Sequence, residues 1–190
     1  GDTTSVIDGS RENCRARECT MGTLVADAML DRVKDQGVQI AIQNGGGLRA
    51  SIEEGPVTMG DVLTVLPFQN TLATFGLSGA GVVAALENGL SAVEDGAGRF
   101  PQVAGLRYTA DLSQPSGARV GSVEVADAEG CSPSDPAASY LLVSNNFMRQ
   151  GGDGYTVFRD DATDAYDYGP GLEEVVGGLN GGGGGEQPTE

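Results

Sequence analysis

A glycine-rich turn that ends in an arginine is the first segment with residue types suited to binding a ligand. Residues 44–49 read NGGGLR and follow directly on a predicted strand. Three successive glycines allow positive φ and a close approach of backbone N–H groups to an anion, and Arg49 can bind a phosphate or carboxylate through two parallel hydrogen bonds. The segment fits neither the Walker nor the dinucleotide pattern, so it is interpreted either as an anion-facing turn or as a structural turn. The glycines are Gly45, Gly46 and Gly47.

An arginine close to two cysteines is the second candidate. Cys14 and Cys19 are five positions apart, and a small-loop disulfide between them is favoured over a reduced pair. A bridged loop would be short and rigid, so Arg15 inside it would be oriented before a ligand arrives. Arg11 and Arg17 are interpreted first as surface counterions.

Cys131 is the third cysteine of the chain, and it is the one residue that could add a third thiolate to the pair. A zinc site is therefore not expected. If the other two cysteines are bridged, Cys131 is expected to be free and buried or shielded, and the compartment of the protein to be oxidising.

The third candidate segment, residues 145–155, reads NNFMRQGGDGY and follows the apolar run SYLLVS. Asp153 could accept hydrogen bonds from a vicinal diol, as an acidic residue does for ribose in dinucleotide sites, or could bond its own backbone in a tight turn. Phe147 and Phe68 are interpreted either as core residues or as rings on which a nucleobase stacks. Phe68 follows Pro67 in a predicted loop, which is notable in a chain with only 5% aromatic residues.

The composition excludes several classes of function. The 190 residues include no histidine and carry a formal charge of −16, from 11 basic and 27 acidic side chains. Hydrolytic metal centres and acid–base sites at neutral pH use imidazole most, so we expect such chemistry elsewhere and no metal site in this chain. The acidity argues against nucleic-acid binding, and no apolar run is long enough to span a membrane. Low lysine content with high acidity fits either a high-salt environment or genomic base composition.

The pattern of apolar positions predicts helices and strands that interleave without strict alternation. Helices are predicted at 21–33 with Thr20 as N-cap, from Thr58 to Val65, and from Ser78 to Leu90. Strands are predicted near 38–43, 70–77, 103–112, 119–126 and 139–145. This order indicates an α+β fold of mixed α/β layers, in which helices pack against a mixed β-sheet.

The organisation along the chain indicates one domain, residues 1–176. Residues 177–190 read GGLNGGGGGEQPTE and are interpreted as a Gly-rich flexible tail or linker. The first residue is Gly1 rather than Met, so a processed chain or an excised piece is expected.

Five short sequence motifs occur in a recognisable order. They are CRARECTMGTLVADAM at 14–29, NGGGLR at 44–49, VLPF at 65–68, GRFPQVAGLR at 98–107 and NFMRQGGDGY at 146–155. Together they cover most of residues 10–160. In this order they resemble the C-terminal, substrate-binding domain of the 5'-nucleotidase family, which includes periplasmic UDP-sugar hydrolase and the animal ecto-5'-nucleotidase.

The resemblance implies roles for the candidate residues on the nucleoside side. Phe68 and Phe147 would stack on the two faces of the base. Asp153 would hold the ribose hydroxyls, and Asn44 would contact the nucleoside.

The resemblance also implies roles on the phosphate side. Arg15 and Arg49 would meet the phosphates, beside the glycine loop 45–47. A disulfide between the cysteines at 14 and 19, and with it secretion, is implied by the most similar first motif in the family. Cys131 departs from the pattern, because the corresponding region of that relative contains a cysteine pair.

For the whole protein, the resemblance implies a nucleotide hydrolase that releases nucleoside and phosphate. Its N-terminal metallophosphoesterase domain, in the same polypeptide, would hold two divalent metal ions and a catalytic His-Asp pair. The present chain would have no catalytic residue and no cofactor, would be inactive alone, and would present the nucleotide to the metals. An extracellular, periplasmic or cell-wall location is implied.

Alternatives remain within and outside this class. The same base platform suits a 2',3'-cyclic nucleotide phosphodiesterase or a UDP-sugar hydrolase. A stand-alone nucleotide-binding module without a catalytic partner would carry the same residues. In the thiosulfate-oxidising relatives of the family, the two phenylalanines and Asp153 would have no obvious purpose.

Overall fold

The structure is a computed structural model that describes residues 1–178. The rest of the predicted tail, residues 179–190, lies outside the described residues. Gly177 and Gly178, which the sequence analysis assigned to the tail, instead belong to the last helix.

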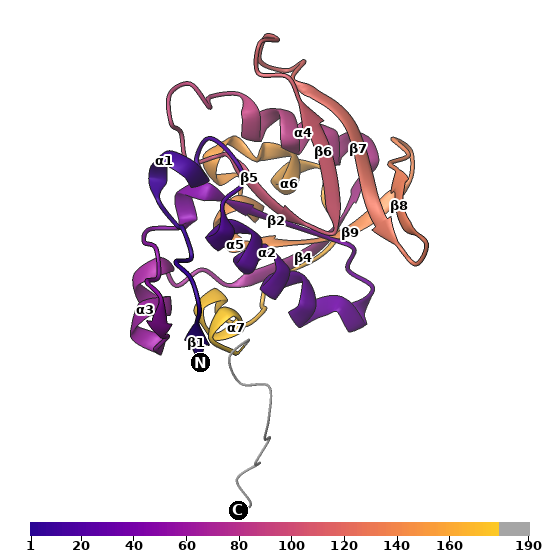
Figure 1. The fold of residues 1–190 in the computed structure, drawn as a ribbon. Helices are drawn as coiled ribbons and strands as arrows, with labels where there is room; N and C mark the ends of the chain where they lie inside the picture. The colour runs from indigo at the N-terminus through magenta and orange to yellow at the C-terminus, as the bar shows by residue number, and fades with distance from the viewer. Residues whose placement is uncertain (179–190) are drawn as a thin grey trace, which may run out of the picture.

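The elements include several short helices and strands between the longer ones (Figure 1). The helices are α1 (Arg11–Cys14), α2 (Thr20–Val33), α3 (Met59–Val65), α4 (Gly79–Leu90), α5 (Asn146–Arg149), α6 (Thr156–Asp160) and α7 (Leu172–Gly178), with 3-10 turns η1 (Lys34–Gln36), η2 (Gly45–Gly47) and η3 (Gly152–Gly154). The strands are β1 (Asp2–Thr3), β2 (Ile40–Asn44), β3 (Gly55–Pro56), β4 (Leu72–Ser78), β5 (Pro101–Ala104), β6 (Leu106–Ala110), β7 (Val120–Asp127), β8 (Gly130–Pro133), β9 (Ser139–Asn145) and β10 (Thr163–Tyr166).

A five-stranded sheet in the order β10-β4-β9-β2-β5 forms the centre of the molecule. Strands β2 and β9 run parallel, and the other neighbouring pairs are antiparallel, so the sheet is mixed. Strands β6, β7 and β8 form a separate three-stranded sheet, and β1 pairs with β3. The predicted mixed sheet with packed helices is confirmed.

Both faces of the central strands are buried. Ile40 and Ile42 of β2 pack into one hydrophobic cluster, with residues of α4, α6 and β7, whereas Ala41 between them packs into the other. Leu142 and Val143 of β9 divide between the clusters in the same way. Because consecutive side chains of a strand point to opposite faces, helices cover this sheet on both sides.

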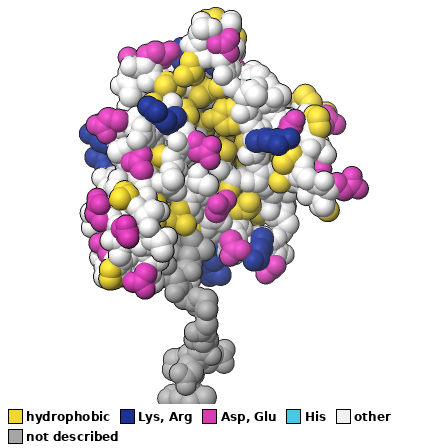
Figure 2. Space-filling model, in the orientation of Figure 1, with side chains coloured by type: hydrophobic (Ala, Val, Ile, Leu, Met, Phe, Trp, Pro, Cys, Tyr) yellow, Lys and Arg dark blue, Asp and Glu magenta, His cyan; other side chains and the backbone are white. Residues whose placement is uncertain are grey.

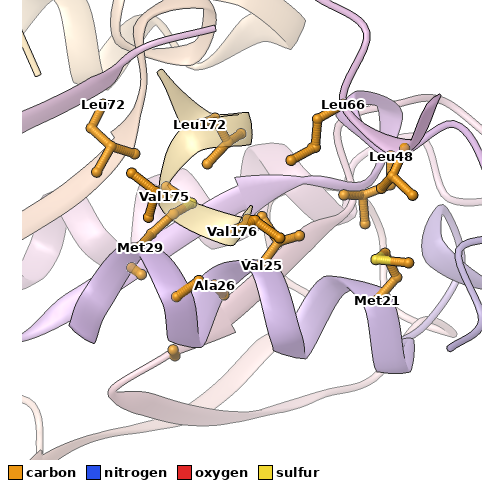
Figure 3. Packing of buried hydrophobic residues seen from close by; sticks show 14 of the residues in the cluster. Met21, Val25, Ala26, Met29, Leu48, Leu66, Leu72, Leu172, Val175 and Val176 are labelled. Atoms are coloured by element: carbon orange, nitrogen blue, oxygen red, sulfur yellow. The ribbon is translucent and has the colours of Figure 1, made fainter. Parts of the chain in front are cut away.

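Helices α2 and α7 close the first of these clusters. Met21, Val25 and Met29 of α2 lie at helical spacing; Val25 and Met29 face Val176 and Val175 of α7, whereas Met21 lies beside Leu48 (Figure 3). These side chains are at most 6% exposed. The last helix therefore fixes the end of the described chain against α2.

The predicted helices are confirmed, with one change in capping. Thr58 forms a capping box with Asp61 at α3, and the Ser78 hydroxyl accepts a hydrogen bond from Gly81 N at α4. Helix α2 is capped by Cys19 rather than Thr20, because the Cys19 sulfur accepts from Gly22 N at 3.2 Å. The Thr20 hydroxyl instead accepts from Asp8 N at 2.7 Å.

The outer sheet explains two differences from the sequence analysis. The strand predicted near 103–112 is divided into β5 and β6 at Gly105, which has φ of 75° and lies so close to Gln39 that a Cβ would be 2.0 Å from its carbonyl oxygen. Cys131 is free but exposed, which corrects the expectation that it is buried. The reason is that β8 lies at the edge of this sheet and is exposed along its length.

The surface is acidic, as the charge of −16 requires. Carboxylate side chains are spread over the face shown in Figure 2, with fewer basic groups between them. No helix among residues 1–178 is long and apolar enough to cross a membrane.

Candidate functional site

One cavity of about 480 Å³ contains every side chain that the sequence analysis selected for ligand binding. Its lining residues are Arg15, Asn44, Gly46, Gly47, Arg49, Phe68, Asn70, Gly98, Phe147 and Asp153. They come from segments up to 138 positions apart (153 minus 15). The structure therefore brings the three candidate segments of the sequence into one site.

The topology of the central sheet explains this convergence. Strands β2 and β9 are parallel, so their carboxyl ends, at Asn44 and Asn145, lie at the same edge of the sheet. Strand β4 is antiparallel to β9 and begins at that edge, with Leu72 opposite Asn145. The turn after β2, the helix after β9 and the loop before β4 consequently meet there, where open α/β sheets commonly bind ligands.

The two phenylalanines of the cavity belong to the surface and not to the core. Phe68 is 55% exposed and Phe147 is 43% exposed. The Arg49 guanidinium lies 5.6 Å from the centre of the Phe68 ring, within the range of a cation–π contact. The Phe147 ring lies against Gly152, where a Cβ would come within 2.6 Å of the ring. Both rings thus offer apolar surface to a ligand in the cavity.

Asp153 is held by partners distant in the sequence. The Asn44 side-chain amide donates to Asp153 Oδ2 at 2.7 Å, and Asn88 donates to the Asp153 backbone oxygen at 3.1 Å. Asp153 has φ of 54°, a conformation that costs free energy for a residue other than glycine. The flanking Gly151 and Gly154 also have positive φ. The turn is therefore a tight one that also directs a carboxylate to the cavity.

Arg15 lies in a loop that is closed twice. A disulfide joins Cys14 and Cys19, with a Cα–Cα distance of 5.1 Å. The buried Gln102 side chain also binds the loop, donating to the Cys14 and Arg17 carbonyl oxygens at 2.9 and 2.8 Å and accepting from Cys19 N at 3.1 Å. The loop is thereby fixed against β5, and Arg15 is oriented by it.

The Arg15 guanidinium is only partly satisfied by the protein. One of its NH groups donates to the Gly96 carbonyl at 3.2 Å, but its Nε is buried without a hydrogen-bond partner among the described residues. Burial, with the nearby charges of Arg11 and Arg49, lowers the pKa of Arg15, and Asp153 opposes this shift. An anion in the cavity would supply the missing acceptor and charge.

The glycine turn serves packing more than the sequence analysis expected. None of the three glycines has positive φ, and together they form η2. The Gly45 and Gly46 N–H groups donate to the Phe100 and Gly98 carbonyl oxygens at 2.8 and 2.7 Å, so neither is free for an anion. A Cβ on Gly45 would be 1.9 Å from the Cys14 oxygen. Gly46 and Gly47 line the cavity, whereas Gly45 allows the Arg15 loop to approach.

Other residues of the site were not predicted from the sequence. Asn70 and Gly98 line the cavity, although each lies in or beside a motif that was recognised. Asn145 and Gln102 are fully buried polar side chains that support the lining residues from behind. Asn70 could have been found from its position two residues after Phe68 in a loop. Gln102 and Asn145 lie in segments that were quoted, but nothing local distinguishes their supporting role.

The described residues do not fit a metal centre of this chain's own. Among residues 1–178 no three His, Cys, Asp or Glu side chains come together in a way that could hold a metal ion. The cavity instead combines two guanidiniums, two aromatic rings and one carboxylate. Such a set can recognise a ligand with an anionic end, a planar ring and hydroxyl groups.

Comparisons with known proteins show the family to which the chain belongs. Residues 1–160 match the family model described as "5'-nucleotidase, C-terminal domain". The chain is 45% identical over 166 residues to the trifunctional nucleotide phosphoesterase protein YfkN of Bacillus subtilis (strain 168), covering 84% of this chain and 11% of that protein. It is 35% identical over 175 residues to the human 5'-nucleotidase, covering 85% of this chain and 30% of that protein.

A solved structure shows the same fold. The 5'-nucleotidase precursor from Thermus thermophilus superimposes with a TM-score of 0.90 and 47% sequence identity, covering 93% of this chain and 35% of that one. The chain thus spans about a third, or less, of the length of these relatives.

Proposed function

Because this chain belongs to the 5'-nucleotidase C-terminal domain family, we propose that it recognises a nucleotide and positions it for a metallophosphoesterase domain of the same polypeptide. The two divalent metal ions, and the residues that activate water, would lie on that other domain. The reaction would release a nucleoside and phosphate. The observation that carries the proposal is the convergence of two exposed rings, two arginines and Asp153 on one cavity.

The geometry of the cavity supports one orientation of the nucleotide. The base stacks between Phe68 and Phe147, whose rings are exposed. The ribose hydroxyls bind the carboxylate of Asp153. The phosphates extend toward Arg15, whose buried Nε has no partner among the described residues, and toward Arg49. Each group of the ligand then meets the side chain that matches its chemistry.

In this mechanism the residues of the chain bind and orient, and the metals supply a Lewis acid and an activated water when they are bound. Holding the phosphate in place converts a bimolecular encounter into an effectively unimolecular step. If the other domain completes the pocket, the chain alone is expected to bind nucleotide weakly and to release no phosphate. We further propose that the protein acts outside the cytoplasm, in keeping with the disulfide at the site.

The proposal is tested by titrating AMP into the chain and following backbone NMR shifts of the cavity residues. Phe147→Ala is expected to weaken binding by about 5- to 160-fold, because stacking on an aromatic ring contributes about 1–3 kcal/mol per base. Tyr168→Ala serves as the matched control, since Tyr168 is an aromatic residue that is 85% exposed and lies outside the cavity. Equal affinity of the wild type and Phe147→Ala would reject the stacking role.

The same samples test whether the chain alone can hydrolyse AMP. With added divalent metal, the chain is expected to release no phosphate from AMP. Turnover by the purified chain would show that the hydrolytic groups lie here rather than on a partner domain.

A further inference from the structure

A chain of buried side-chain amides connects strand β9 to the carboxylate of Asp153. The amides are those of Gln43, Asn44 and Asn145, which are at most 3% exposed. The family resemblance implies a contact between Asn44 and the nucleoside, and neither it nor the proposed function assigns a role to the other two. Buried polar groups of this kind are costly unless every donor and acceptor is matched, so their arrangement carries information.

The direction of the hydrogen bonds is fixed at the β9 end by the backbone. The Met148 N–H group can only donate, and it donates to Asn145 Oδ1 at 2.9 Å, which caps helix α5. Asn145 must therefore present its Nδ2 group to its other neighbours. It donates to Asn44 Oδ1 at 3.0 Å and to Gln43 Oε1 at 2.8 Å.

The direction is fixed independently at the Asp153 end. A carboxylate oxygen can only accept, so Asn44 must turn its Nδ2 group toward Asp153 Oδ2, which it reaches at 2.7 Å. Asn44 Oδ1 then faces inward and accepts from Asn145, and also from Gln43 Nε2 at 3.3 Å. Both ends of the network demand the same orientation of the Asn44 amide.

We propose that Asn145 is a positioning residue that makes the site selective for ribose over 2'-deoxyribose, an inference that rests on the proposed function. Asn145 orients Asn44, and Asn44 holds one oxygen of the Asp153 carboxylate. The carboxylate is thereby fixed in the cavity before a vicinal diol arrives. Because Asn145 also caps α5, the helix that carries Phe147, it links the sugar side of the site to the base side.

Two substitutions separate this role from the capping role. Asn145→Asp keeps an oxygen for the Met148 N–H group but replaces the amide donor by an acceptor, so Asn44 is expected to turn over and direct its oxygen at Asp153. Asn145→Ser also keeps a capping oxygen, and it removes the donor without adding charge. Asn146→Asp is the matched control, since its side-chain oxygen accepts from Thr71 N and lies outside the amide network.

The readout is the ratio of the dissociation constants for 2'-deoxy-AMP and AMP. The wild type is expected to bind AMP roughly tenfold more tightly than 2'-deoxy-AMP, because one hydrogen bond to a charged group contributes about this ratio. In Asn145→Asp and Asn145→Ser the ratio is expected to fall to about twofold or less, while Asn146→Asp keeps the wild-type ratio. A loss of overall stability would weaken both ligands together and leave the ratio unchanged.

The outcomes distinguish this inference from the proposed function. A folded Asn145→Asp or Asn145→Ser variant that keeps the tenfold ratio overturns the inference. A wild type that binds AMP and 2'-deoxy-AMP equally also overturns it, but leaves nucleotide binding in place. A wild type that binds neither ligand overturns the proposed function and the inference with it.

A second measurement applies if the Asn145 variants do not fold. In the wild-type chain, the side-chain NH₂ groups of Asn44 and Asn145 are expected to exchange with solvent at least tenfold more slowly than that of the exposed Gln150, because they are buried and hydrogen bonded. Exchange as fast as that of Gln150 would show that the network does not hold Asn44, and the inference would fail.

Discussion

The two sides of the cavity are built by different means. On the side that we propose for the phosphates (the phosphate side), Arg15 lies in a loop outside the sheet, and this loop is closed by a disulfide and by the Gln102 side chain. On the side that we propose for the nucleoside (the nucleoside side), Asn44 lies at a strand end, and hydrogen bonds between side chains orient it toward Asp153.

The difference follows from what the backbone already fixes. The ends of β2 and β9 are positioned by neighbouring strands, so on that side only the direction of side-chain amides remains to be set. Residues 15–19 have no strand partner, and the Gln102 side chain supplies the hydrogen-bond partners of the Arg17 carbonyl oxygen and the Cys19 N–H group. We therefore expect changes on the phosphate side to affect stability, and changes on the nucleoside side to affect selectivity.

The largest effect is expected from Gln102→Ala. The substitution leaves the Cys14 and Arg17 carbonyl oxygens and the Cys19 N–H group without their partner. Each unsatisfied buried group costs about 1–3 kcal/mol, so the free energy of unfolding should fall by about 3 kcal/mol or more in urea denaturation.

The control for this prediction is Gln114→Ala, because Gln114 is exposed and bonds a nearby exposed carboxylate. Its effect should be below about 0.5 kcal/mol. A loss in Gln102→Ala as small as in this control would mean that the disulfide alone holds the loop.

A smaller effect is expected from removing the disulfide. The double substitution Cys14→Ser and Cys19→Ser opens a loop of only five residue steps, for which chain entropy gives a loss of about 2 kcal/mol. Because Gln102 still binds both ends of the loop, AMP affinity should fall less than in Gln102→Ala. Cys131→Ser is the control and should change neither quantity, since Cys131 is exposed on the outer sheet. A greater loss of AMP affinity than in Gln102→Ala would mean that the disulfide, rather than Gln102, is the main constraint on the loop that carries Arg15.

Local signals explain which parts of the fold could be predicted from the sequence. Helices α3 and α4 are capped by Thr58 and Ser78, whose side-chain oxygens accept from N–H groups only three residues further along the chain. The apolar periodicity of α2 is equally local. The short elements β8 and β10 have four residues each and no buried side chain, so they leave no periodic pattern to recognise.

Long-range contacts explain which parts of the site could not be predicted. The lining residues could be selected because their types suit a ligand and their motifs resemble a family. The roles of Gln102 and Asn145 depend on partners 88 and 101 positions away, and nothing near them in the sequence marks these contacts. The turn that contains Gly45 was interpreted either as anion-facing or as structural, and the structure shows that the missing side chain of Gly45 allows the close approach of Cys14.

The smallest effect on stability is expected from a substitution of Asp8, which forms hydrogen bonds within the segment before the disulfide loop. Its carboxylate accepts from Ser10 N at 2.9 Å and from the Asn13 side chain at 2.6 Å. The hydrogen bond from the Ser10 backbone, followed by those of nearby side chains, lowers the pKa of Asp8 below its usual 3.8, and partial burial opposes this. A carboxylate whose pKa is lower in the folded state stabilises the fold above the unfolded pKa, and this contribution is lost as the pH falls through the folded pKa.

Asp8→Asn should therefore destabilise the protein at pH 7 by less than about 1 kcal/mol, because solvent screens a carboxylate so close to the surface. The difference from the wild type should shrink as the pH falls below about 4 in parallel urea denaturation series. Asp161→Asn, at an exposed carboxylate of the α6 end, is the control and should change the free energy of unfolding at pH 7 by less than about 0.5 kcal/mol. A difference that grows on acidification would mean that the protonated carboxyl group of Asp8 stabilises the folded state more than its carboxylate does. Acid would then stabilise, rather than destabilise, the segment before the disulfide loop.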